Sequence, residues 1–298
     1  MSDWGKGVIN NIGWGQGADN DIGWGSIYDK SNAGQTLLSG SGFEGILNQF
    51  PGASLGLSLE LLDKDYSGFC IKVRRSSDNN ELDIGFSNDV LDTASLLDFV
   101  GSGNGFVTII YDQVGSNNMT QTTSSLQGQI VSNGSVILKG GKPCIIRSTD
   151  LNGGYLSTYA PNNGANVKGV FYVGAKFGVG GRTTMFGSNT GDSDYSLSAE
   201  GGSTSTNLDS NVIITENKLN GVSTTFTNRD DAATKLSEQF LLYREIDFNF
   251  DNNVLGLGYR KTRPSNFGMF TFQELVIFEN TDDAVAKENN INARYNIY

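Results

Sequence analysis

The stretch that decides the fold is the run Phe270-Thr271-Phe272-Gln273-Glu274-Leu275-Val276-Ile277-Phe278. Two phenylalanines alternate with other residues at its start, and a run of apolar residues follows them. Aromatic and β-branched residues favour an extended backbone that packs on a pleated, buried surface. The run therefore predicts a strand in the centre of a β-sandwich.

Similar strand patterns recur along the chain, with glycine, asparagine and serine between them. Leucines stand at alternate positions from Leu55 to Leu61, which predicts a half-buried strand. The other predicted elements are a short helical turn over 43–50 and strands over 70–74, 105–111, 136–138, 143–146, 169–175, 211–215, 240–244 and 254–259. Many short strands separated by such turns indicate an all-β sandwich.

Two longer helices are expected among these strands, over residues 91–100 and from about 282 to 295. Asp92 is suited to cap the first helix, because its carboxylate can accept a backbone N–H of the first turn. Cys70 and Cys144 lie in apolar runs. Buried free thiols are the favoured interpretation, since a disulfide would need an oxidising compartment.

Composition excludes several classes of protein. The chain of 298 residues carries a formal charge of −11, which argues against nucleic-acid binding and against polybasic attachment to a membrane. No run of about 18 apolar residues is present, so no membrane insertion is expected. Histidine is absent, which excludes catalysis and metal binding that depend on an imidazole.

The start of the chain carries a repeat of tryptophan and glycine. Trp4, Trp14 and Trp24 stand at a fixed spacing, and each is followed by glycine. Ile12 and Ile22 precede the second and third tryptophans at equivalent positions. A fixed period indicates a repeated local structure, and tryptophan is enriched at interfaces. We therefore predict that these five side chains dock onto a partner.

The repeat divides the predicted organisation of the chain into two parts. Residues 1–50 are expected to form an extended docking leader rich in glycine and tryptophan, and residues 51–298 are expected to form one domain. The alternative is that the leader packs back onto its own domain.

Two blocks of sequence resemble known families. The first, over residues 55–150, holds the runs Glu60-Leu61-Leu62-Asp63-Lys64-Asp65-Tyr66-Ser67-Gly68, Asp83-Ile84-Gly85-Phe86 and Tyr111-Asp112-Gln113. It resembles the start of the catalytic domain of fungal-type α-L-arabinofuranosidase B, and it is similar to a block in many phage structural proteins. The second, from Gly256 to Tyr298, resembles the end of a concanavalin A-like jelly roll of the laminin-G or lectin type. Together they imply a concanavalin A-like jelly-roll β-sandwich.

The glycine–tryptophan leader resembles those of phage virion fibre and spike proteins. This resemblance implies a bacteriophage virion structural protein, a head or tail fibre, spike or decoration subunit, that is assembled in the host cytoplasm and exposed on the particle. The implied partners are other virion proteins (capsid, portal, tail or fibre base), further copies of the chain in a homotrimer, and a host-surface glycan for attachment. We therefore predict that the protein acts by binding and is not an enzyme.

The main alternative is a glycoside hydrolase that resembles the arabinofuranosidases and acts on surface polysaccharide. Such an enzyme needs two carboxyl groups about 5 Å apart, and no motif places them. The acidic candidates are Asp192, Asp194, Glu200, Glu216 and Asp247. A secreted adhesion module is a further alternative, although we find no signal peptide for it.

Some residues are candidate ligand contacts. The candidates for sugar contacts are Arg74, Tyr195, Tyr243 and Tyr259. A guanidinium can bind a sugar carboxylate through two hydrogen bonds, and tyrosine rings can stack on sugars. The simpler interpretations are an ion pair of Arg74 or Arg75 with Asp78 or Asp83, and ordinary packing of the tyrosines.

One stretch is a candidate calcium site. Asp247, Asn249 and Asp251 place oxygen atoms at alternate positions, as oxygen ligands of Ca²⁺ would require. The simpler interpretation is a hairpin turn at residues 251–253. No other cofactor is predicted.

Overall fold

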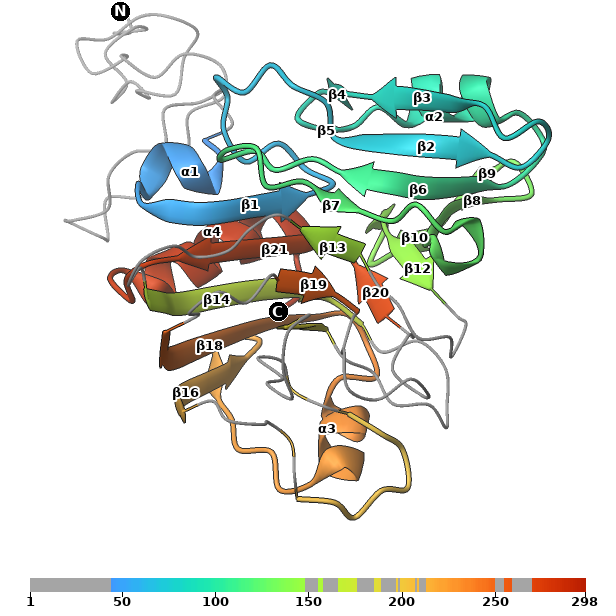
Figure 1. The fold of residues 1–298 in the computed structure, drawn as a ribbon. Helices are drawn as coiled ribbons and strands as arrows, with labels where there is room; N and C mark the ends of the chain where they lie inside the picture. The colour runs from blue at the N-terminus through green and yellow to red at the C-terminus, as the bar shows by residue number, and fades with distance from the viewer. Residues whose placement is uncertain are drawn as a thin grey trace, which may run out of the picture. The chain divides into compact units, whose positions relative to one another are not determined.

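The computed structural model describes residues 44–147 and 270–298 without a gap. Between them it describes residues 155–157, 166–175, 185–188, 197, 199–206, 208, 213–249 and 255–258. In this part of the chain the fold is an all-β, jelly-roll sandwich of antiparallel strands, as predicted (Figure 1). The tryptophan repeat lies outside the described residues, and the compact unit begins at Glu44, shortly before the predicted boundary.

The first sheet has six strands in the order β1-β21-β14-β18-β16-β17. They are β1 (Ala53–Ser58), β14 (Asn166–Gly174), β16 (Ile213–Leu219), β17 (Val222–Ser223), β18 (Phe240–Asn249) and β21 (Glu274–Phe278). Strand β21 lies between β1 and β14, and all of its residues are buried. The end of the deciding stretch therefore takes the central position that its sequence predicts.

The second sheet has eleven strands, with the main order β15-β19-β13-β7-β6-β8-β12-β20. Strand β2 pairs with β6 and β3, and β9 pairs with β8. The bounds are β2 (Ile71–Arg75), β3 (Glu81–Ile84), β6 (Gly105–Ile110), β7 (Met119–Thr120), β8 (Gln129–Ser132), β9 (Ser135–Val136), β12 (Ile145–Arg147), β13 (Tyr155–Ser157), β15 (Phe186–Ser188), β19 (Leu255–Leu257) and β20 (Phe270–Phe272). Two hairpins stand apart: β4 (Phe86–Ser87) with β5 (Val90–Leu91), and β10 (Leu138–Lys139) with β11 (Lys142–Pro143).

The deciding stretch is two strands and not the single strand that its pattern predicts. Strand β20 pairs with β12 in the eleven-stranded sheet, whereas β21 belongs to the six-stranded sheet. The chain passes from one sheet to the other at Gln273, which is fully buried. Both halves are extended and apolar, so their composition does not reveal the break between them.

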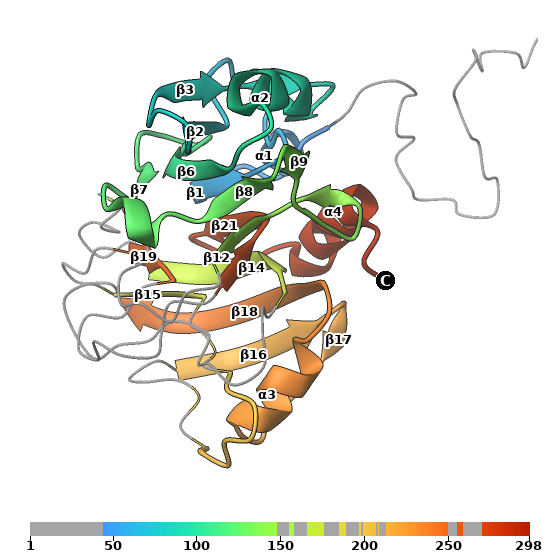
Figure 2. The ribbon, with the colours of Figure 1, turned by 90° about the vertical axis from the view of Figure 1, so that its right-hand side faces the viewer.

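The six-stranded sheet is buried on both faces. Because side chains alternate across a strand, Leu275 and Ile277 face the core between the two sheets, while Val276 and Phe278 face a second core. The second core is closed by α1 (Ile46–Gln49) and α4 (Ala284–Tyr295). Figure 2 shows α4 beside this sheet. Burial on both faces explains why β21 reads as a nearly continuous apolar run.

The second core also corrects the prediction of a half-buried strand from Leu55 to Leu61. Strand β1 ends at Ser58, and its last four residues are buried on both faces. Leu55 and Leu57 face the core between the sheets. Gly56 lies close to side chains of Leu47 and Leu62, which belong to the layer on the other side.

The predicted helices are confirmed. Asp92 caps α2 (Thr93–Val100), and its carboxylate accepts the backbone N–H of Ser95 at 3.0 Å. Helix α4 covers most of the predicted terminal helix. No helix in the described ranges has both the length and the apolar character that a membrane span requires.

The structure contains one helix that the sequence analysis did not predict, and it shows the state of the two cysteines. Helix α3 (Arg229–Lys235) was not expected, although Asn228 caps it by accepting the N–H of Asp231 at 2.9 Å. An amide cap followed by acidic residues in the first turn is a signal that the sequence did contain. Cys70 and Cys144 are buried free thiols, as predicted.

Asp112 fixes the corner that follows β6. Its Oδ1 accepts the backbone N–H groups of Gly56 and Val114, both at 3.0 Å. Its Oδ2 accepts those of Gly115 and Asn117, both at 3.1 Å. The buried carboxylate thus joins the loop to β1 through four backbone donors.

The Asp112→Asn variant tests this corner. One carboxylate oxygen becomes an amide NH₂, which is a donor facing two backbone donors. We expect the free energy of unfolding to fall by about 2–4 kcal/mol, because buried donors lose their acceptor. Urea denaturation measures the change, and D98N on the exposed side of α2 is the control. A loss no larger than that of D98N would contradict the role of Asp112.

A shortened chain tests the division at residue 44. Every core residue that the structure describes lies at Ile46 or beyond. We therefore expect residues 44–298 to keep the Tm of the full chain to within about 3 °C, a shift that corresponds to less than roughly 1 kcal/mol for a domain of this size. A markedly lower Tm would show that the leader packs on its own domain.

Candidate functional site

Arg74 projects from β2, and uncharged groups hold it. Its Nε donates to Gln127 Oε1 at 2.8 Å, and its Nη1 donates to Asn79 Oδ1 at 2.7 Å. The guanidinium carbon lies 4.9 Å from the centre of the Phe106 ring. Arg74 therefore lies on a partly exposed face of the sheet without a carboxylate partner in these contacts.

Arg75 forms the ion pair that the simpler interpretation predicted. Its Nε and Nη2 donate to the two oxygens of Asp78, at 2.8 and 2.7 Å. This hydrogen-bonded pairing lowers the pKa of Asp78 to about 2. Asp83 pairs instead with Lys72 on the neighbouring strand, at 3.6 Å.

Tyr243 does not offer a surface on which a sugar could stack. Its side chain is fully buried in the second core, with its ring centre 4.8 Å from that of Phe171. The ammonium nitrogen of Lys218 lies 5.4 Å from the centre of the same Tyr243 ring. Packing, the simpler interpretation, thus accounts for this tyrosine.

Tyr195, Tyr259 and Asp251 lie outside the described residues. Asp247 and Asn249 are part of β18, where their backbones pair with Ile213 and Asn166. Within the described ranges, no group of three or more acidic or cysteine side chains is placed to hold a metal ion. The calcium site stays a prediction.

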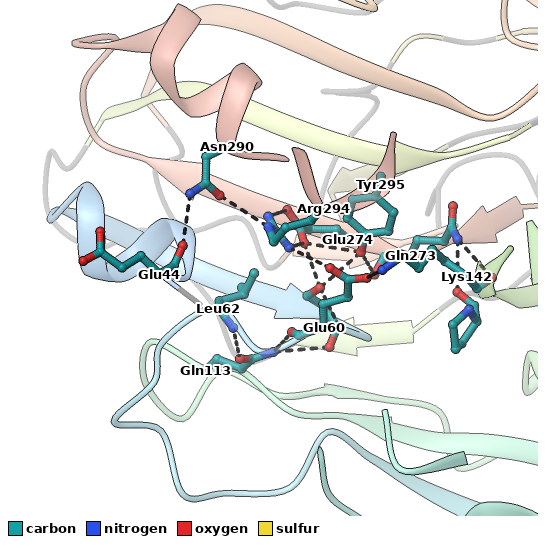
Figure 3. Close-up of polar contacts among 12 residues, drawn as sticks. Glu44, Glu60, Leu62, Gln113, Lys142, Gln273, Glu274, Asn290, Arg294 and Tyr295 are labelled. Carbon is teal, nitrogen blue, oxygen red and sulfur yellow. Dashed lines mark hydrogen bonds and ion pairs between the residues drawn. The ribbon is translucent and has the colours of Figure 1, made fainter. Parts of the chain in front are cut away.

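A cluster of charged side chains lies inside the fold where β1, β21 and α4 meet (Figure 3). Arg294 of α4 donates from Nη1 and Nη2 to the two oxygens of Glu274, both at 2.6 Å. Arg294 Nη1 also lies 3.5 Å from Glu60 Oε2, and Lys142 Nζ lies 2.7 Å from Glu60 Oε1. Ser58 donates its hydroxyl to Glu274 at 2.8 Å.

Hydrogen bonds from a glutamine and the last turn of α4 position the groups of this cluster. Gln113 holds the turn that carries Glu60, since its amide donates to the carbonyl of Glu60 at 2.9 Å and accepts the N–H of Leu62 at 2.8 Å. Arg294 and Tyr295 stand on the last turn of α4, above the first residue of β21. Two cations therefore meet two carboxylates.

Glu60 and Glu274 share two properties with a catalytic pair of carboxyl groups, a short separation and the raised pKa of one member. Glu60 and Glu274 both contact one guanidinium nitrogen, so they lie within about 6 Å of each other, close to the separation in retaining glycosidases. Burial raises the pKa of Glu60, although Arg294 and Lys142 oppose this effect. A raised pKa beside a second carboxylate is the arrangement expected of an acid catalyst.

Access decides against catalysis at this pair. The side chains of Glu60 and Glu274 are 3 and 0 % exposed, and Arg294 lies between them. A substrate could reach neither carboxylate without displacing α4 or the Lys142 side chain. The cluster is therefore a buried clamp between the helix and the sheet, and removal of one partner from such a cluster leaves a buried charge without its counter-charge.

Two of the other acidic candidates also have structural partners. Glu200 lies 3.5 Å from Arg229, and Glu216 lies 3.8 Å from Lys218. Glu216 additionally accepts the hydroxyl of Ser223 at 3.2 Å. Asp192 and Asp194 lie outside the described residues.

An exposed group of side chains was missed by the sequence reasoning. Phe69 is 49 % exposed, and its ring centre lies 6.0 Å from that of Tyr111. Tyr111 donates its hydroxyl to Asp83 at 2.5 Å. Phe69 follows the turn before β2 and Tyr111 follows β6, so only the pairing of these two strands brings the rings together.

No family model matches this chain, and no curated protein matches it. Three solved structures do. They are a GH54 α-L-arabinofuranosidase soaked with a cyclic sulfate inhibitor (16% identity), an arabinofuranosidase complexed with arabinofuranosyl-α-1,2-xylobiose (15%), and a mutant GH54 α-L-arabinofuranosidase soaked with 4-nitrophenyl α-L-arabinofuranoside (16%). Each alignment covers 80% of this chain and 62% of the other, with a TM-score of 0.49.

These matches correct one prediction. All three structures are of arabinofuranosidases, which contradicts the prediction that the chain is not an enzyme. The described part of this chain is an all-β, jelly-roll sandwich. None of the three is a virion protein, and the chain spans only 62% of their length.

The Glu60→Gln variant tests the clamp through its pH dependence. Because the pKa of Glu60 is raised in the folded chain, its contribution to stability is complete below the unfolded pKa and is lost as the pH rises through the folded pKa. We therefore expect wild type to lose stability relative to E60Q as the pH rises from about 4.5 to 7.5. Urea unfolding at several pH values measures this difference.

A control at the exposed Glu279, E279Q, corrects for the loss of one acidic charge. If wild type instead gained stability over E60Q as the pH rose, the ion pairs with Arg294 and Lys142 would outweigh burial. The description of Glu60 as a carboxyl group with a raised pKa would then be wrong.

Proposed function

We propose that this chain is a glycoside hydrolase-type sandwich that acts on glycans carrying arabinofuranosyl groups. The observation that carries the proposal is the meeting of two blocks of sequence with separate resemblances. The block at 55–150, which resembles an arabinofuranosidase catalytic domain, supplies Glu60. The block that resembles the end of a jelly roll supplies Glu274 and Arg294, and Arg294 contacts both Glu274 and Glu60 in the interior.

This contact supports a common origin for the two resemblances. If the blocks belonged to unrelated domains, they would not share a buried ion cluster and paired strands β1 and β21. One fold serves many functions, so an activity assay tests the proposal.

The catalytic carboxyl groups of such an enzyme must be reachable by substrate. Glu60, Glu274, Glu200 and Glu216 have structural partners, as described above. The remaining acidic candidates are Asp192, Asp194 and Asp247, and we propose that the catalytic pair is among them.

The assay measures release of 4-nitrophenol from 4-nitrophenyl α-L-arabinofuranoside and of arabinose from arabinofuranosyl-xylobiose. Wild type is expected to release product from at least one compound. Among D192N, D194N and D247N, loss of a catalytic carboxyl group is expected to lower kcat by about 100-fold or more. The control is E216Q, which removes a carboxylate that already has a lysine partner. Folded wild-type protein that releases nothing from either compound would refute the proposal.

The docking leader remains a separate proposal, supported by the tryptophan repeat alone. In it, Trp4, Trp14 and Trp24 anchor the chain to other virion proteins, and a trimer displays the domain toward host-surface glycans. A displayed hydrolase is compatible with this location. Labelling of purified phage particles with an antibody to residues 51–298 would test it, and unlabelled particles would count against it.

A further inference from the structure

We propose that the outer face of β2, β3 and β6 is a binding site for a neutral oligosaccharide. The class of ligand rests on the proposed function, whereas the surface itself is defined by described residues on and beside these three strands. Phe69, Tyr111, Lys72, Asp83, Arg74 and Phe106 make up this surface, which we call the platform.

Strand alternation places the platform on the side of the sheet that faces away from the core. Ile71 and Val73 of β2 belong to the core between the sheets. Lys72 and Arg74 alternate with them and so face outward. Asp83 is the register partner of Lys72 on β3.

Phe69 and Tyr111 form the aromatic end of the platform, and both are held in place. Tyr111 is fixed by its hydrogen bond to Asp83, which in turn pairs with Lys72. The segment that carries Phe69 is fixed by Tyr66, whose hydroxyl donates to the Phe69 carbonyl at 2.9 Å. A half-exposed phenylalanine held in one place loses little conformational entropy when a ligand stacks on it.

The other end of the platform is Arg74 with Phe106. The guanidinium lies over the ring and is oriented by Gln127 and Asn79. Both ends therefore combine an aromatic ring with hydrogen-bonding groups. At about 3.3 Å per residue, the strand from Ile71 to Arg74 alone spans roughly 10 Å, enough for about two sugar rings.

The charges of the platform favour a neutral ligand. Lys72 is paired with Asp83, and Arg74 stands opposite Glu81 in the register of β2 and β3. The two cations of the platform, Lys72 and Arg74, are therefore matched by Asp83 of the platform and by the neighbouring Glu81. An anionic polymer such as nucleic acid gains nothing from such a surface, because its affinity depends on an excess of positive charge.

The size and composition of the platform favour a sugar over a protein. A stable protein interface buries about 800 Å² on each partner around an apolar centre. Here the apolar centre is one half-exposed phenylalanine among polar groups. A sugar ring matches this surface, since it offers an apolar face to an aromatic ring and hydroxyl groups to a carboxylate, an ammonium and a tyrosine hydroxyl.

The test compares two exposed aromatic side chains in the full chain. Phe69 and Tyr298 are 49 and 48 % exposed, so F69A and Y298A are matched variants. Tyr298 lies next to Gly221, in the turn between β16 and β17 of the six-stranded sheet. Affinity gel electrophoresis with linear arabinan and with arabinoxylan gives the dissociation constants. We expect F69A to weaken binding about tenfold, as loss of a stacked ring implies, and Y298A to leave it unchanged. Thermal unfolding checks that both variants fold.

The result separates the platform from the proposed activity. If wild type binds polysaccharide through Phe69 but releases no product from small arabinofuranosides, the platform stands and the hydrolase proposal fails. If F69A hydrolyses and binds polysaccharide as wild type does, the platform is refuted and the hydrolase proposal stands. Failure of wild type to bind either polysaccharide also refutes the platform.

Discussion

The side chain of Gln273 is the contact on which the two-sheet arrangement depends. Where the chain leaves one sheet for the other, the backbone of Gln273 still pairs with Val173 and Leu59, and its buried side chain joins the crossing to the β10–β11 hairpin. Its Nε2 donates to the carbonyls of Lys139 and Pro143, both at 3.1 Å, and its Oε1 accepts from Gln239 at 2.8 Å. Leaving such groups unpaired in the interior would cost about 1–3 kcal/mol each. The crossing is held in place because one amide joins it to two carbonyls of the hairpin and to the Gln239 side chain.

The next residue carries the fold outward to its helical layer. Glu274 begins β21 directly after the crossing, and its carboxylate binds Arg294 of α4. The helix can therefore cover the outer face of the six-stranded sheet only in the register that this pair allows. Two adjacent residues, Gln273 and Glu274, thus place both the crossing between the sheets and the second core.

The sequence reveals the all-β class and most strands, because alternation and turn residues are local signals. It does not reveal which apolar strands have two buried faces, since that depends on a helix from elsewhere in the chain. Tyr243 was misread for this reason. A glutamate inside an apolar run was the available sign that β21 needs a buried cationic partner. The pairing of Phe69 with Tyr111 had no local sign, because it arises from strand register.

The pairing of β1 with β21 has a consequence for how the chain is made. These neighbouring strands contribute residues that lie 216 positions apart, such as Ser58 and Glu274. On the ribosome, β1 emerges long before its partner has been synthesised. We expect nascent chains that stop before Glu274 to expose an unpaired apolar edge, which invites aggregation or a chaperone. Protease sensitivity of stalled chains would show whether the sandwich closes only at the end of translation.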